Sequence, residues 1–343
     1  MFGGSAALAL GLGVALRPLA EGRLSDGLWL VFVLGLDVAH VWTTLFRTYL
    51  DREEVARRRA LYLGLPLACY VGGVALHLVS HAWFWRVLAY VAVFHFVRQQ
   101  IGWVAVGRAR AGGSGRLDRW LDDAAIYLAT GVPLLAWHAR MPRAFHWFVA
   151  GDFVDSARSR ALAASALPFA EALYGLVAVA YVSRAVTLAR RGRTLWSKHV
   201  VVVSTALVWW IGIVTFDDDV TFTVSNVTLH GLPYIALVWG YAEARGAERP
   251  EGLVGRIARG GFVAFFAVAL ALAFVEELGW DRLVWHDREW LFGEGRSLDA
   301  RARAFVVPLL ALPQAVHYAL DGFLWRRRDG GPAQARALGF APP

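Results

Sequence analysis

The sequence predicts an all-α protein, a polytopic transmembrane helical bundle of about ten spans. Hydrophobic residues make up 57% of the 343-residue chain and charged residues only 18%, a composition typical of helices that lie in lipid. The apolar stretches reach or approach the ~20 residues that a helix needs to cross a bilayer. They are residues 3–20, 27–48, 60–80, 83–107, 119–139, 166–190, 198–216, 222–243, 260–278 and 303–326.

The arginines orient these spans. Arginine-rich segments follow the second, fourth, sixth and tenth stretches, at 51–60, 107–119, 190–198 and 325–331. Arginine collects in cytoplasmic loops, so we expect both termini in the cytoplasm and an integral protein of a bacterial inner membrane. Residues 1–326 are expected to form a single transmembrane domain, and 327–343 a short cytoplasmic tail. These loops also account for the net charge of +8, so no nucleic-acid partner is indicated.

Four histidines lie near the centres of spans that run in the same direction. At 1.5 Å per residue their imidazoles fall within a layer ~10 Å thick. A single intramembrane histidine can simply hydrogen-bond a neighbouring helix. Four at one depth favour a shared site, because ionisable groups in the bilayer are costly and usually functional. The sequence therefore predicts a set of metal ligands: His40, His95, His230 and His317.

Each of these histidines has polar companions three or four residues away, a spacing that places side chains on one face of a helix. A ligating imidazole usually gives its other N–H to such a group. We therefore expect second-shell partners or alternative ligands among Asp37, Arg98, Gln99, Asn226 and Asp321. The sequence assigns no catalytic residue.

A second, weaker metal candidate lies at the outer end of the third span. His77 and His81 stand four residues apart, a spacing that suits two ligands of one ion on one helix face. The same spacing also suits a pair of interfacial histidines that water can reach.

Neutral imidazoles without thiolates suit iron, zinc, copper or nickel. Fe(II) is the expected cofactor, with zinc or haem as alternatives, and the hydrophobic surroundings favour a membrane lipid or another lipid-soluble substrate. The expected activity is that of an iron-dependent membrane oxygenase. Two other functions stay open: a proton-coupled transporter or channel that uses the His/Asp cluster, and a haem-binding electron carrier. The sequence does not indicate an oligomeric state.

Several tracts resemble bacterial integral membrane proteins that carry many histidines. They are the three-residue spacing of Asp37 and His40, "FHFVRQQIGW" at 94–103 and "VHYALDGFLWRRR" at 316–328. The dispersal of single histidines over several spans is similar, in pattern, to the Brp/Blh family, membrane β-carotene dioxygenases that use iron to cleave the polyene to retinal. That resemblance implies a carotenoid-like or other isoprenoid substrate, and iron ligands at His40, His95, His230 and His317.

Overall fold

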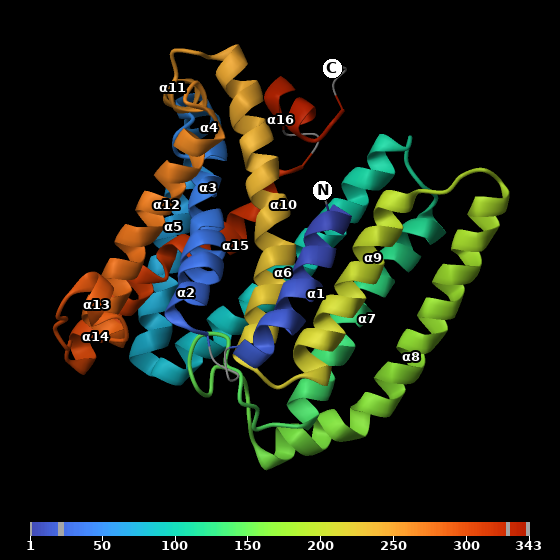
Figure 1. The fold of residues 1–343 in the computed structure, drawn as a ribbon, viewed down its shortest axis with the longest axis horizontal. Coiled ribbons are helices and arrows are strands. Elements are labelled where there is room, and N and C mark those ends of the chain that lie inside the picture. The colour runs from blue at the N-terminus through green and yellow to red at the C-terminus, as the bar shows by residue number, and fades with distance from the viewer. Residues whose placement is uncertain (1, 20–23, 327–329, 341–343) are drawn as a thin grey trace. The chain divides into compact units, whose positions relative to one another are not determined.

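The computed structural model describes residues 2–19, 24–326 and 330–340. Every regular element in these residues is helical, which confirms the all-α prediction (Figure 1). Six helical segments are long and apolar enough to cross a membrane, which is compatible with an integral membrane protein. The predicted number of about ten spans is not confirmed. The six segments are Asp26–Arg47, Arg59–Val79, Ala157–Arg190, Trp196–Thr215, Gly261–Trp285 and Ala300–Leu324.

The chain forms two compact units. The first comprises Met1–Ser25 and Ala92–Pro233, and the second Asp26–Val91 and Tyr234–Pro343. Helices α6 and α10 each continue from one unit into the other; they extend over His81–Arg110 and Asp219–Glu248. The expected single domain ending at residue 326 stays a prediction.

In the first unit, α7 packs against α8 and α9, and α1 packs against α9. Helix α8 begins with a capping box, in which Ser156 and Ser159 each accept a hydrogen bond from the other's backbone N–H. Its outer face leaves Phe169, Leu176 and Val179 exposed, as expected of a helix side that contacts lipid. The bounds are α1 Phe2–Leu16, a 3₁₀ turn Arg17–Leu19, α7 Arg116–Ala139, α8 Ala157–Arg190, α9 Trp196–Trp209 and a π-helical stretch Trp210–Thr215.

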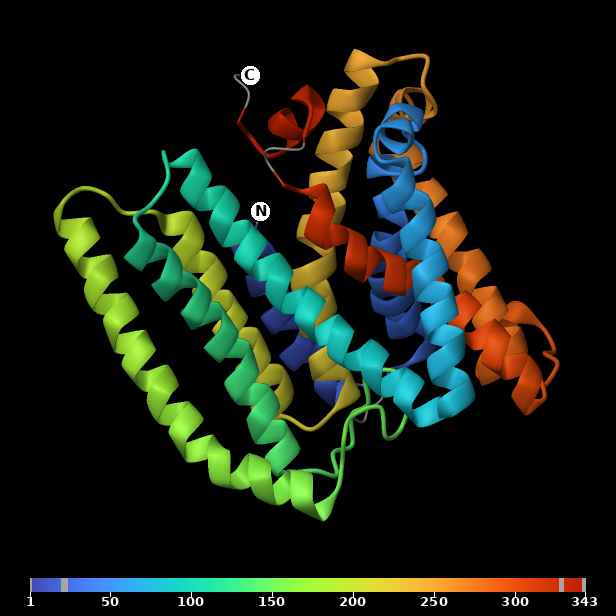
Figure 2. The ribbon, with the colours of Figure 1, turned by 180° about the vertical axis from the view of Figure 1, so that it is seen from behind.

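In the second unit, α3 packs against α12 and α15, and α15 packs against α5 (Figure 2). The predicted span 303–326 is two helices: the first ends at Leu310, Ala311 lies between them, and Pro313 lies in the first turn of the second. The bounds are α2 Asp26–Leu28, a π-helical stretch Trp29–Val38, α3 Ala39–Arg47, α4 Arg52–Arg57, α5 Arg59–Val79, α11 Leu253–Ala258, α12 Gly261–Trp280, a π-helical stretch Asp281–Trp285, α13 Glu289–Phe292, α14 Ala300–Leu310, α15 Leu312–Leu324 and α16 Pro332–Ala337.

Part of the predicted tail is folded against α3. Gln334 of α16 is buried, and its Oε1 accepts a 2.6 Å hydrogen bond from the Arg47 guanidinium. Residues 327–329 and 341–343 of the tail lie outside the described residues. The described part of the tail is therefore a structural element of the second unit.

An ionic network fixes the chain just beyond α3. Asp51 caps α4 and accepts hydrogen bonds from Arg245, at 2.7 and 3.0 Å, and from the Tyr241 hydroxyl, at 2.9 Å. Burial opposes ionisation of Asp51, but these hydrogen bonds outweigh it and hold the pKa of its carboxyl below the ordinary value.

Candidate metal centre

All four predicted ligand histidines are buried, with 3% or less of each exposed. His40 lies on α3 and His317 on α15, both in the second unit. His95 lies on α6 and His230 on α10, in the part of each helix that belongs to the first unit. Buried, uncharged imidazoles are the form in which histidine binds a metal.

The His40 ring is held by its own helix. Nδ1 donates a hydrogen bond of 3.1 Å to the backbone carbonyl of Leu36. Because a carbonyl can only accept, this bond fixes the proton on Nδ1 and leaves the lone pair of the neutral ring on Nε2. The Asp37 carboxylate is 3.8 Å from Nδ1, and 42% of its side chain is exposed. The predicted acidic partner is therefore close, but the carbonyl makes the hydrogen bond.

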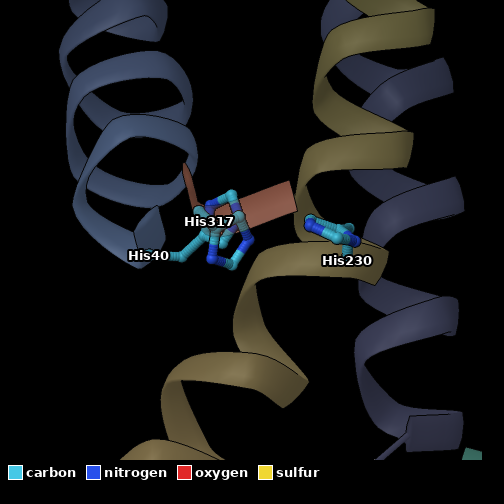
Figure 3. A group of neighbouring side chains, drawn as sticks. All are labelled: His40, His230 and His317. Atoms are coloured by element: carbon cyan, nitrogen blue, oxygen red, sulfur yellow. The ribbon is translucent and has the colours of Figure 1, made fainter. Parts of the chain in front are cut away.

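His317 lies beside His40, with their ring centroids 5.0 Å apart (Figure 3). Its Nδ1 is 2.8 Å from Oγ1 of Thr44, and that hydroxyl is 3.0 Å from the hydroxyl of Tyr234. The Tyr234 ring also packs edge-on against both imidazoles. A chain of two hydroxyls thus occupies Nδ1 of His317 and orients the ring.

The first unit holds a second histidine pair. Nε2 of His95 is 3.3 Å from Nε2 of His230, and the two rings are nearly perpendicular. The Phe96 ring stacks on His230 with centroids 3.9 Å apart, and Trp147 packs against Phe96 at 5.3 Å. Aromatic side chains therefore fix His230 from one side, while its Nε2 faces His95.

Helix α10 carries both His230 and Tyr234. His230 and Tyr234 are four residues apart on this uninterrupted helix, so they share one face. Tyr234 contacts His40 and His317. His40, His230 and His317 form a group of buried imidazoles that could hold a metal ion.

The other predicted partners differ in their surroundings. Arg98 is exposed and donates to the Tyr127 hydroxyl at 3.3 Å, so it does not share the burial of His95. The Asn226 amide donates to the Phe222 carbonyl of its own helix at 3.2 Å. Gln99 is buried one turn after His95, and Asp321 is partly buried one turn after His317. For Gln99, Asn226 and Asp321 a supporting role stays a prediction.

The expectation of a shared helix face for His77 and His81 is wrong. The chain breaks at Ser80, so His77 lies in the last turns of α5 and His81 begins α6. Trp85 Nε1 is a donor only and bonds Nε2 of His81 at 3.2 Å; Nδ1 of His81 therefore donates to Nε2 of His77 at 3.0 Å. Both nitrogens of His81 are engaged in this chain of hydrogen bonds.

The sequence reasoning overlooked Thr44, Tyr234 and Phe96. Thr44 follows His40 by four residues and Tyr234 follows His230 by four residues, which is the spacing used to select the charged and amide companions. A residue with a hydroxyl on an apolar helix usually packs against its neighbours or hydrogen-bonds the backbone of its own helix. Nothing in the sequence therefore distinguished these two residues as partners of a histidine.

An apolar cavity of about 290 Å³ adjoins His317 in the second unit. Helices α3, α5, α14 and α15 contribute its walls, which include Trp42, Pro66, Leu312 and Val316. Thr44, the hydrogen-bond partner of His317, also lines it. The cavity therefore places hydrocarbon surface directly beside one of the candidate ligands.

No family model, curated protein or solved structure matches this chain. The functional argument therefore rests on its own residues.

Proposed function

We propose that this chain is a membrane-embedded, non-haem iron oxygenase that acts on a hydrophobic lipid or an isoprenoid, carotenoid-like substrate. The observation that carries the proposal is the fixed orientation of buried imidazoles. A carbonyl holds Nδ1 of His40 and a hydroxyl lies within hydrogen-bond distance of Nδ1 of His317, so Nε2 is the nitrogen with which each ring would bind an ion. His230 on α10 is the third ligand and His95 the fourth.

The spacing of His95 and His230 supports one shared ion. Two nitrogens bound to one metal at adjacent positions, each ~2.0–2.1 Å from it, lie roughly 3–3.4 Å apart. The observed 3.3 Å is a hydrogen-bond distance between the two rings and also falls in that range. Axial ligands on opposite faces of a haem would be separated by about 4 Å, and Phe96 covers the His230 ring. The donor set thus favours a non-haem ion over haem.

The cavity supports a hydrocarbon ligand because its polar wall groups already have partners. Thr48 donates to the Thr44 carbonyl at 2.8 Å, and Tyr49 donates to the Tyr62 carbonyl at 2.9 Å. The Trp42 indole N–H is bonded outside the cavity, to Glu276. A polar ligand group in this space would lose its bonds to water without replacement, whereas an alkyl or isoprenoid segment would lose none.

Iron would supply the activation of O₂ in such a site. Cleavage of a carbon–carbon double bond then balances without a further reductant, because each oxygen atom ends in one of two new carbonyl groups. The protein's own contribution is to orient the imidazoles, to hold the hydrocarbon beside His317 and to exclude water.

The proposed topology extends the six apolar segments to about ten spans by including α1, α6, α7 and α10. In this arrangement both termini lie on the cytoplasmic side of a bacterial inner membrane, where the arginine-rich loops meet anionic headgroups. Reporter fusions at the arginine-rich loops and at the intervening loops test each crossing.

The first test is elemental analysis of the purified protein, with its visible spectrum, beside a His95→Ala/His230→Ala variant. We expect stoichiometric iron without a haem band in the natural protein, and no iron in the variant. Measurements of O₂ consumption with candidate polyenes then identify the substrate. Zinc in place of iron would overturn the oxygenase assignment. Absence of any metal from the natural protein would overturn the metal centre and favour assays of proton-coupled transport.

A further inference from the structure

A buried carboxylate lies in the apolar helix α12. Glu276 is 6% exposed, within the segment Gly261–Trp285 that is long and apolar enough to cross a membrane. A carboxylate at such a position is costly unless its environment compensates it, and intramembrane acids usually have a function. The predicted set of site residues did not include Glu276.

Three neutral donors engage both oxygens of Glu276. Trp42 donates to Oε2 at 2.7 Å, Trp280 donates to Oε1 at 3.3 Å, and the Gln314 amide also donates to Oε1. Donors on both oxygens favour the ionised form of a carboxyl group. Burial in apolar surroundings favours the protonated form more strongly, so an ionised Glu276 needs a cation in addition to these hydrogen bonds.

Among the residues that the structure describes, no ion pair involves Glu276. The ionisable side chains whose charges act on it or on which it acts include three acidic groups: Asp37, Glu277 and the Tyr318 hydroxyl. An ionised Glu276 therefore calls for a cation of another kind.

The donors connect Glu276 to both ligand-bearing helices of the second unit. Trp42 lies on α3, two residues after His40, and it also lines the cavity beside His317. Gln314 lies on α15, three residues before His317, on the same helix face. One carboxylate thus holds α3 and α15 through its two oxygens.

We propose that Glu276 is the counter-charge of the metal centre, an inference that rests on the proposed binding of a divalent ion. Four neutral imidazoles leave both positive charges of such an ion uncompensated, and in an apolar interior uncompensated charge is expensive. Glu276 supplies one negative charge near α3 and α15 without occupying a coordination position.

The test uses Co²⁺, whose visible absorption reports its coordination, titrated into metal-free full-length protein in lipid nanodiscs. Glu276→Gln keeps an oxygen that can accept from Trp42 but removes the charge. We expect its Co²⁺ affinity to fall roughly tenfold, the lower range for a group that supports a metal from outside the ligand set. The absorption spectrum at saturation should match that of the natural protein, because the ligands are unchanged.

The matched control is Glu277→Gln, which makes the same substitution at the next residue of α12 and should change the affinity by less than about twofold. Equal affinities of the Glu276→Gln variant and the natural protein would overturn the counter-charge. An altered Co²⁺ spectrum in that variant would also overturn it, because Glu276 would then act by positioning the ligands. If the natural protein binds no Co²⁺, the metal centre itself fails, which is a separate result.

Discussion

The second unit contains two close histidine pairs whose hydrogen bonds differ. In the pair His40 and His317, backbone or hydroxyl oxygens hold Nδ1 of each ring. In the pair His77 and His81, the rings bond each other, and Trp85 takes the remaining nitrogen of His81. In both pairs the centroids of the two imidazole rings are 5.0 Å apart or less. A short distance between the rings is therefore common to both pairs. The pairs differ in the groups that bond the ring nitrogens: in the first pair oxygen atoms orient each ring for an ion, and in the second pair the rings form a hydrogen-bonded chain.

The largest expected effect comes from removing a ligand of the first pair. His317→Ala takes away one imidazole and leaves the Thr44 hydroxyl without its ring partner. We expect the purified variant to contain no stoichiometric metal, because three histidines cannot complete the proposed four-nitrogen set. Elemental analysis measures this, and thermal unfolding confirms that the variant is folded. Full metal content in a folded variant would exclude His317 as a ligand.

A smaller effect tests the hydroxyl rather than the ligand. Thr44→Val removes the group that holds Nδ1 of His317 while conserving the shape of the side chain, and we expect metal affinity to fall about tenfold. Thr43→Val is the matched control, because Thr43 is also buried and its hydroxyl donates to the carbonyl of His40 in its own helix rather than to a ring nitrogen. Equal losses in the two variants would show that helix packing, not ring orientation, controls the affinity. Metal titration in nanodiscs measures both.

The comparison also shows which features were accessible from sequence. Burial follows from hydropathy, so the buried His40, His95, His230 and His317 could be selected; the common direction of their helices stays a prediction. The carbonyl of Leu36 could not, because every residue has one and only the local ring conformation decides which carbonyl accepts. Glu276 was missed because its partners are two indoles and an amide rather than a charge, and no fixed spacing marks such a set.

One chain break was also hidden. The stretch 303–326 reads as continuous apolar sequence, but the chain breaks at Ala311, whereas the break at Ser80 lies at the predicted boundary between 60–80 and 83–107. At Ser80 the break separates His77 from His81, so a spacing of four residues loses its meaning. At Ala311 the new helix α15 begins, and its first turn leads to Gln314 and His317. Hydropathy detects length and not the local backbone geometry that ends a helix.

The second pair yields a prediction of little change. His77→Phe and His81→Phe should each leave metal content and affinity within about twofold of the natural protein, since most substitutions away from a site act within ±0.5 kcal/mol. Phenylalanine conserves the aromatic packing against Phe84 and Trp85. Loss of metal in either variant would reverse the distinction between the pairs and make His77 and His81 a site in their own right.

The smallest expected effect on metal binding comes from Asp51, which anchors the chain beyond α3 but does not contact the histidines in any described interaction. Asp51→Asn removes charged hydrogen bonds to Arg245 and should lower the free energy of unfolding at pH 7 by about 2 kcal/mol. Metal affinity at that pH should stay within about twofold, because ring orientation at His40 and His317 depends on Leu36 and Thr44.

The pH dependence of unfolding separates this anchor from the metal centre. The folded-state pKa of Asp51 lies below its ordinary value of 3.8, so its stabilising contribution is fully present above that pH. It is lost as the pH falls through the folded-state pKa, when Asp51 of the natural protein takes up a proton. The stability difference between the natural protein and the Asp51→Asn variant, measured by urea unfolding, should therefore narrow below pH 3.8. A stability difference that does not change with pH would mean that Asp51 stabilises the fold by shape and hydrogen-bond geometry alone. A loss of metal affinity in the Asp51→Asn variant would mean that the end of α3, as well as the local contacts of the ring, positions His40.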